Sequence, residues 1–174
     1  MVVPSPDAVL IMGLYGSGKS SVAAEMAELL EERDVAYAAI DLDWLAWANV
    51  GDADGHGPIE NPLLVPNLRA VVANDRAAGV RRFVLAGTIR SSPEREALRD
   101  ALAMPMRVIR LDVPMNVIET RLGGDPTSGR AADLAVARRA AADGVGEGLE
   151  DLTVDNNRAI REVAADIVRW LGWI

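Results

Sequence analysis

Three patterns follow one another near the start of the chain, and together they limit the fold more than any other feature does. Residues 8–12 form a continuous apolar run, which is typical of a strand buried on both faces. The glycine-rich stretch 13–20 comes directly after it. From Val22 onward, apolar residues recur at i, i+4, i+7 and i+8, which predicts a helix from about Ser20 to Arg33. A buried strand that passes through glycines into a helix indicates an α/β chain.

The remaining sequence continues this alternation of strands and helices. Apolar runs predict further strands at 35–40, 82–86, 108–111 and 152–154. Helices are predicted from Leu64 to a stop at Gly79, from Ser92-Pro93 onward, and over 114–122, 131–142 and 158–170. Stretches 51–62 and 123–129 are rich in Gly, Asp and Pro, so we expect loops there. The alternation implies a parallel sheet with helices on both faces and binding sites at the carboxyl ends of its strands.

Length and charge limit the domain count and the partners. The 174 residues show no repeat and no linker, so we expect a single domain over residues 1–174. There are 18 basic and 26 acidic residues, and the resulting net charge of −8 argues against binding of nucleic acid or anionic membrane surfaces. A local pocket can still bind a small anion.

Cysteine content and hydropathy point to a cellular compartment. The chain has no cysteine, which excludes disulfides, thiolate nucleophiles and cysteine-based metal sites and suits a reducing compartment. No apolar run reaches the length of a membrane span, and residues 1–7 lack the basic and apolar regions of a signal peptide. We therefore expect a cytoplasmic protein.

The glycine-rich stretch matches a phosphate-binding pattern: Gly13, four residues, Gly18, Lys19, then Ser20. In such a loop, backbone N–H groups surround phosphate oxygens, and the helix N-terminus adds its positive end. Lys19 would reach the terminal phosphates, and the Ser20 hydroxyl could bind Mg²⁺. Lys19 is also the only lysine among the 18 basic residues, which suggests that this position needs a compact charge on a flexible stem. The alternative is a glycine-rich turn that merely joins a strand to a helix.

Four features together resemble the small-molecule kinases of the nucleoside monophosphate kinase-like P-loop superfamily. They are the glycine-rich motif, the pair Asp41-Leu-Asp43 after the second strand, the arginine-bearing loop 121–130, and the strand end 154–157. The nearest patterns are shikimate kinase, adenylylsulfate kinase and chloramphenicol phosphotransferase. The resemblance implies a three-layer P-loop NTPase fold with a five-stranded parallel sheet of order 2-3-1-4-5. It also implies transfer of the γ-phosphoryl group of ATP to a small-molecule acceptor, with Mg²⁺, and a mobile lid at 121–130.

The resemblance further implies roles for individual residues. Asp41 and Ser20 would serve the Mg²⁺ ion, and Asp43 would orient or deprotonate the acceptor hydroxyl. Lys19, Asp43 and Arg121 would form the catalytic set. The nucleotide would lie against residues of the motif and two later positions: Gly13, Tyr15, Gly16, Ser17, Gly18, Lys19, Ser20, Ser21, Arg121 and Asn157. The alternative for the acidic pair is that one Asp caps a segment beginning at Trp44.

Two arginines have alternative interpretations. As part of a lid, Arg121 would stabilise charge on the transferred phosphoryl group. Otherwise it pairs on the surface with Glu119 or Asp125. Arg90, just beyond the third strand, is a candidate for binding an anionic part of the acceptor. The participation of Arg130, at the far end of the loop, is left open.

Other residues also have more than one interpretation. Trp44 and Trp47 are three apart and could form an acceptor platform, although aromatic residues at helical spacing more often belong to the core. His56 lies in the predicted loop 51–62, where an exposed residue is expected rather than a catalytic base. Asp112 follows a strand in a setting that suits a magnesium ligand, or it caps the strand end before Pro114.

The leading functional prediction is an ATP-dependent kinase of a small molecule, as a monomer or homodimer. A regulatory ATPase, or a nucleotide-binding module without acceptor chemistry, is the alternative. A guanine-reading switch is disfavoured, because its Asn-Lys-x-Asp element requires a second lysine. Consumption of ATP that depends on an acceptor would separate the kinase from the other two.

Overall fold

A parallel sheet of five strands forms the centre of the computed structural model, which describes residues 7–48, 62–123 and 130–174. Its strand order is β2-β3-β1-β4-β5, and every neighbouring pair is parallel. The α/β fold class and the sheet order predicted above are therefore confirmed. The strands are β1 (Ala8–Met12), β2 (Tyr37–Asp41), β3 (Arg82–Ala86), β4 (Met106–Asp112) and β5 (Leu152–Asp155).

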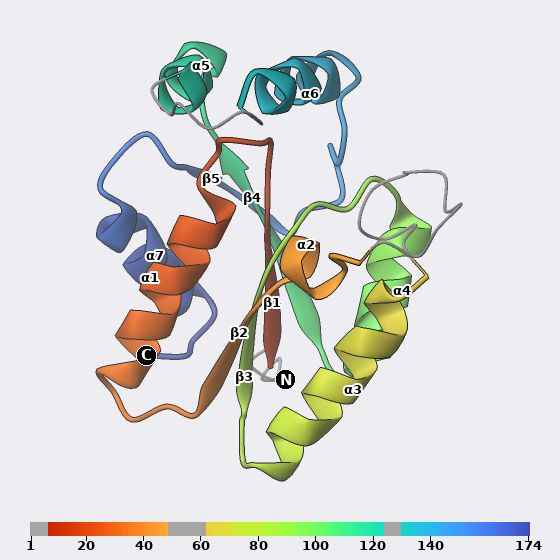
Figure 1. Cartoon of the computed structure of the whole chain (residues 1–174). Helices are drawn as coiled ribbons and strands as arrows, with labels where there is room; N and C mark the ends of the chain where they lie inside the picture. Colours follow the sequence, from red (N-terminus) through yellow and green to blue (C-terminus); the bar gives the residue numbers. More distant parts are fainter. Residues whose placement is uncertain (1–6, 49–61, 124–129) are drawn as a thin grey trace.

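Helices cover both faces of the sheet and one of its ends (Figure 1). One face carries α1 (Lys19–Glu31) and α7 (Ile160–Trp170), and the other carries α3 (Leu64–Ala77) and α4 (Ser92–Leu102). Beyond the carboxyl ends of the strands lie α5 (Met115–Gly123) and α6 (Arg130–Ala142), and α2 (Leu42–Leu45) directly follows the end of β2. None of the helices in the described ranges is long and apolar enough to cross a bilayer.

The core consists of one apolar cluster on each face of the sheet. Val9 and Ile11 of β1 pack with residues of α1 and α7, whereas Leu10 and Met12 pack with residues of α3 and α4. All five residues of β1 are buried, as its unbroken apolar run predicted. Alternate side chains of this central strand thus anchor both layers of helices, and they fix the position of the loop that follows Met12.

The second strand starts and ends later than predicted. Val35, placed in a strand at 35–40, instead donates its N–H to the Leu30 carbonyl at the end of α1 (3.1 Å). The strand ends at Asp41, which is in register with Ala86 of β3. Asp41 therefore sits on the last position of the strand, at the carboxyl edge of the sheet.

The fourth strand is longer than the predicted 108–111. It includes Arg107, whose guanidinium pairs with Asp151 at 3.3 Å. Asp151 also accepts from the Val108 N–H (2.7 Å) and pairs with Arg95 of α4 (2.8 Å). One carboxylate thus pairs with two arginines and a backbone N–H, which holds a basic residue at a partly buried position of the strand.

Helix boundaries differ from the predictions by one or two residues. Helix α4 is capped by Ser91 rather than Ser92, because the Ser91 side chain accepts from the Glu94 N–H (3.4 Å). The short helix α2 was not predicted as an element of its own, since four residues are too few to show a period. His56 and most of the predicted lid 121–130 lie outside the described residues.

Candidate active site

The loop between β1 and α1 has a backbone that only glycine adopts readily. Gly16 and Gly18 have φ angles of 77° and 94°. A Cβ atom on Gly16 would lie 2.9 Å from Leu122, and one on Gly18 would lie 2.8 Å from the Asn156 side chain. Both glycines are therefore required by positive φ and by close neighbours.

The amino-terminal turn of α1 keeps its backbone donors available. Gly18 occupies the cap position without a side-chain hydrogen bond, and no acidic residue stands in the first turn. The first N–H groups of a helix have no partner within the helix, and they lie at the positive end of its dipole. This turn therefore offers the donors that phosphate oxygens require.

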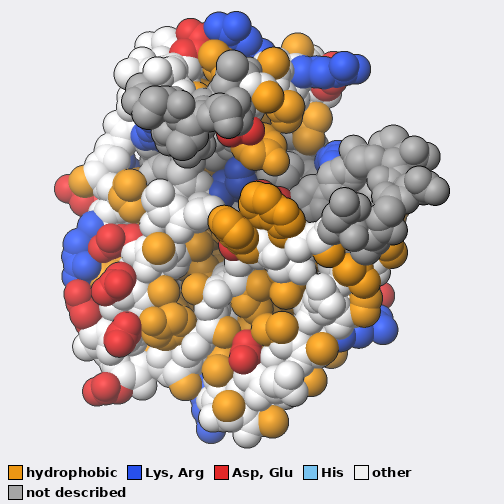
Figure 2. All heavy atoms as spheres, in the orientation of Figure 1, with side chains coloured by type: hydrophobic (Ala, Val, Ile, Leu, Met, Phe, Trp, Pro, Cys, Tyr) orange, Lys and Arg blue, Asp and Glu red, His pale blue; other side chains and the backbone are white. Residues whose placement is uncertain are grey.

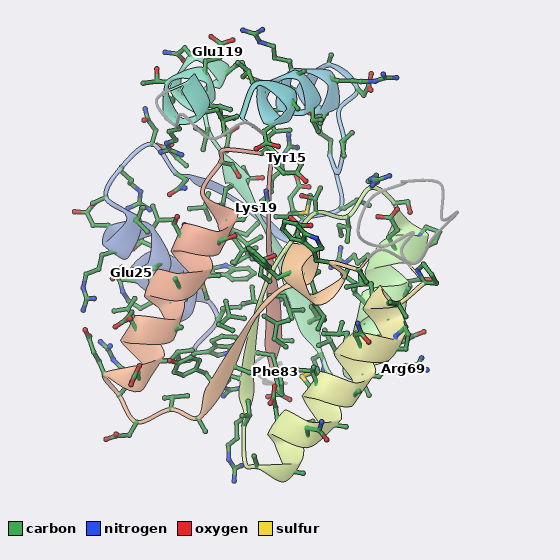
Figure 3. All side chains as sticks on the ribbon, viewed as in Figure 1. Tyr15, Lys19, Glu25, Arg69, Phe83 and Glu119 are labelled. Atoms are coloured by element: carbon green, nitrogen blue, oxygen red, sulfur yellow. The ribbon has the colours of Figure 1, made fainter. Side chains whose placement is uncertain are left out.

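Lys19 extends from this turn back over the loop. Its Nζ donates to the Leu14 carbonyl (3.1 Å) and lies 5.2 Å from the centre of the Tyr15 ring. Burial lowers the pKa of Lys19, and the carboxylates of Asp43 and Asp41 oppose this shift. Figure 3 shows Tyr15 and Lys19 between α6 and α2, at the carboxyl edge of the sheet.

Asp41 connects α1 with α2. Its Oδ2 accepts from the Ser20 hydroxyl (2.8 Å), and its Oδ1 accepts from the N–H groups of Asp43 (3.0 Å) and Trp44 (3.2 Å). The capping role considered for this pair is thus present at Asp41. The same carboxylate also contacts the hydroxyl predicted to serve Mg²⁺.

Asp43 is half-buried and stands beside two cavities. Burial raises its pKa, the Lys19 ammonium opposes the shift, and the Asp41 carboxylate adds to it. One cavity, of about 450 Å³, also contacts Lys19 and Ser20. The other, of about 500 Å³, also contacts Thr88 and Arg90. Because Asp43 and Tyr15 line both cavities, these two side chains mark the place where the cavities meet.

Arg121 is held against the phosphate-binding loop. Its guanidinium donates to the carbonyls of Ser17 (3.3 Å), Gly16 (3.4 Å) and Asn156 (2.9 Å). The surface pair with Glu119 does not form, because Glu119 pairs with Arg138 at 2.7 Å. Asp125, the other suggested partner, lies outside the described residues.

Asn156 is a site residue that the sequence analysis missed. It is 1% exposed, its Nδ2 donates to the Ser17 carbonyl (2.7 Å), and it lines the cavity beside Lys19. Asn157, predicted at the nucleotide, is exposed, and its N–H donates to the Asp155 side chain (2.9 Å). The alternation of β5 contained the missing signal, since Leu152 and Val154 face inward and Asn156 continues their phase.

The other predicted positions lie as follows. Ser21 lines the smaller cavity and Arg90 the larger one. Thr88, which was not predicted, donates its hydroxyl to the Gly13 carbonyl (3.1 Å) beside the larger cavity. Asp112 is exposed, and its carbonyl accepts from the Asn156 N–H (2.9 Å). The side chain of Arg130 lies outside the described residues.

A magnesium ion at this site would depend on ligands beyond the protein. Among the described residues there is no group of three or more His, Cys, Asp or Glu side chains that could hold a metal. Ser20 and Asp41 lie in direct contact and offer a hydroxyl and a carboxylate at the foot of the loop. Mg²⁺ is commonly held by one or two such groups together with substrate phosphates and water. The donor set therefore fits Mg²⁺ that arrives with a nucleotide.

The sheet order and the strand–loop–helix site together define a P-loop fold. No family model and no curated protein matches the sequence. Solved structures do match over nearly the whole chain. The adenylylsulfate (APS) kinase of Mycobacterium tuberculosis, solved with AMPPNP and APS, has a TM-score of 0.61 at 24% identity, covering 98% of this chain and 99% of its own.

Two further structures have the same relationship to the chain. A gluconokinase from Sinorhizobium meliloti has a TM-score of 0.62 at 20% identity, with 98% of this chain and 94% of that one covered. The tunicamycin resistance protein of Deinococcus radiodurans has a TM-score of 0.63 at 20% identity, with 97% and 96% covered. The chain thus has the fold of P-loop small-molecule kinases, as the resemblance in its sequence predicted.

Proposed function

We propose that the chain transfers the γ-phosphoryl group of ATP to a hydroxyl of a small molecule. The observation that carries the proposal is the position of Asp43, which lines both the cavity beside Lys19 and Ser20 and a second cavity of about 500 Å³. A nucleotide switch needs only the first cavity. A carboxylate between two cavities suits a reaction between two bound substrates.

The phosphate side of the reaction rests on the loop and on α1. The free N–H groups of the first turn would hold phosphate oxygens, and the Lys19 ammonium would move from the Leu14 carbonyl to the terminal phosphates. Ser20 and Asp41 would hold Mg²⁺, which neutralises charge on the phosphates when bound. Arg121 and Asn156 would keep the outer side of the loop in place through the Ser17 carbonyl.

The acceptor side depends on Asp43. A general base works best when its pKa lies closer to the working pH, and burial raises the pKa of Asp43 in that direction. Asp43 would take the proton of the acceptor hydroxyl as the oxygen attacks the γ-phosphorus. Arg90, on the wall of the larger cavity, would face an anionic group of the acceptor where it has one.

Labelled γ-phosphate offers a direct test. The purified chain is incubated with [γ-³²P]ATP, Mg²⁺ and pools of metabolites and antibiotics, and labelled products are separated from free phosphate. We expect transfer that requires an acceptor and falls by roughly 10² to 10⁴ in Asp43→Asn. Asp100→Asn is the matched control, since the Asp100 side chain is 68% exposed on α4 and lines neither cavity, and it should keep wild-type transfer.

Slow release of phosphate that no pool accelerates, unchanged in Asp43→Asn, would reject the proposal in favour of a regulatory ATPase.

A further inference from the structure

Two tryptophans next to Asp43 are exposed to solvent and stacked on each other. Trp44 is 70% exposed and Trp47 is 75% exposed. Their ring centroids lie 4.8 Å apart, with 28° between the ring planes. The interpretation of this pair as part of the core is therefore wrong. Burying an aromatic side chain of this size is normally favourable, so two exposed ones, one in a short helix and one just after it, require an explanation.

The tryptophan side chains are not part of the hydrophobic core, because other residues of the turn are buried in their place. The inward side of the α2 turn is provided by Leu42, 1% exposed, and Ala46, 5% exposed. The turn continues past the helix, because the Trp47 N–H donates to the Trp44 carbonyl (3.1 Å). Trp44 directly follows Asp43 within α2, and the Trp47 ring stacks on the Trp44 ring. The tryptophan pair is thus continuous with the carboxylate that stands between the two cavities.

Exposed apolar side chains gather around this site rather than over the whole surface. Seven large hydrophobic side chains are exposed among the described residues. Tyr15 and Val136 line the larger cavity, and Ile160 lines the smaller one. Trp44 and Trp47 line neither cavity, but they adjoin Asp43, which lines both, and Figure 2 shows hydrophobic side chains gathered over α2 at the centre of one face. Apolar surface concentrated at a cavity is typical of a binding site.

We propose that the acceptor carries a flat aromatic ring, which stacks on the Trp44–Trp47 pair while its hydroxyl lies at Asp43. This inference rests on the proposed function and names its substrate class. Two stacked indoles present a planar, polarisable face, which suits a ring better than a linear polyol. The adjoining cavity of about 500 Å³ has the size of a small-molecule site. Ring-free sugar acids lack the group that this face would bind.

Pairs of compounds that differ only in the ring provide the test. Phenyl and methyl β-D-glucoside, and uridine and ribose, are titrated into the chain with AMP-PNP and Mg²⁺, and binding is followed by calorimetry and by quenching of tryptophan fluorescence. We expect the member with the aromatic ring, phenyl β-D-glucoside or uridine, to bind at least about tenfold more tightly than its partner in at least one pair. The double variant Trp44→Leu/Trp47→Leu should lose this preference and keep its affinity for AMP-PNP. Trp170→Leu is the matched control, because Trp170 is 45% exposed on α7, away from both cavities.

Several outcomes would overturn the inference. One is equal affinity for the two compounds of every pair, and another is an unchanged preference for the aromatic compound in the double variant. A third is a loss of self-association in the double variant, which would assign the two tryptophans to contact between two copies of the chain. Phosphoryl transfer to an acceptor without an aromatic ring, with a wild-type KM in the double variant, would reject the proposed aromatic acceptor. It would leave the proposed function intact. Binding of the aromatic compounds without any phosphoryl transfer to them would reject the proposed function and leave the aromatic-binding site intact.

Discussion

Replacing Asn156 by alanine tests how the carboxyl end of β5 supports the phosphate-binding loop. The substitution removes the 2.7 Å bond from Nδ2 to the Ser17 carbonyl, in a position only 1% exposed. A buried hydrogen bond contributes about 0.5 to 1.5 kcal/mol net, and a buried group left without its partner costs about 1 to 3 kcal/mol. Two features of the site reduce that cost.

The first feature is that the Ser17 carbonyl keeps a second donor, Arg121 at 3.3 Å. The second is that Asn156 Oδ1 is buried and has no hydrogen-bond partner within the described part of the chain, so its removal relieves a penalty. We therefore expect Asn156→Ala to lower the free energy of unfolding by about 1 to 2 kcal/mol. Because the Ser17 carbonyl lies inside the loop, the affinity for AMP-PNP should fall as well, by about tenfold if 1.4 kcal/mol of this support is lost from the bound state.

Urea denaturation and calorimetric titration with AMP-PNP measure the two effects. Asn157→Ala is the matched control, since Asn157 is the neighbouring residue, of the same type, and exposed. It should change the free energy of unfolding by less than about 0.5 kcal/mol and leave nucleotide affinity unchanged. The reasoning is refuted if the two variants behave alike, or if Asn157→Ala has the larger effect on nucleotide binding.

Three further outcomes follow from the same geometry. Lys19→Ala should lower kcat/KM for transfer by at least about 10², with little change in the urea midpoint, because no other lysine can replace its ammonium; wild-type turnover would remove the nucleotide assignment. Asp43 must be ionised to accept a proton and its pKa is raised above 3.8, so kcat/KM should fall as pH drops through that raised pKa; an identical acidic limb in Asp43→Asn would assign the titration elsewhere. Asp41→Asn should raise the Mg²⁺ concentration for half-maximal rate about tenfold and Asp100→Asn, on the exposed side of α4, should not; equal requirements would reduce Asp41 to a helix cap.

Much of the fold could be predicted because its signals are local. The apolar run 8–12 and the glycines after it determine a buried strand and a loop with little help from the rest of the chain. The length of β4 could not be predicted in this way. Arg107 interrupts the apolar run, and the carboxylate that neutralises it, Asp151, is 44 residues away in sequence. Only the folded chain brings the two together.

The candidate site also contains some residues that local sequence signals predict and others that they do not. Lys19, Ser20 and Asp43 follow from motifs within a few residues, and all three line the smaller cavity. The exposure of Trp44 and Trp47 was not predictable from spacing, because Leu42 and Ala46 already fill the inward side of a turn too short to show a period. Asn156 was missed for a different reason, since the two adjacent asparagines differ only in which way the strand turns them.

The double attachment of Asp41 has a thermodynamic consequence for ligands that bind at the two ends of this carboxylate. One oxygen of this carboxylate receives the Ser20 hydroxyl and the other receives two N–H groups of α2. A ligand that breaks the hydrogen bond from the Ser20 hydroxyl changes the position of the Asp41 carboxylate. Because that carboxylate accepts from the N–H groups of Asp43 and Trp44, their positions change as well. Coupling of this kind is reciprocal, because a ligand that shifts α2 must alter the affinity at Ser20 by the same factor. Under the proposed function, any synergy between nucleotide and acceptor that Asp41 transmits would have the same size measured from either side.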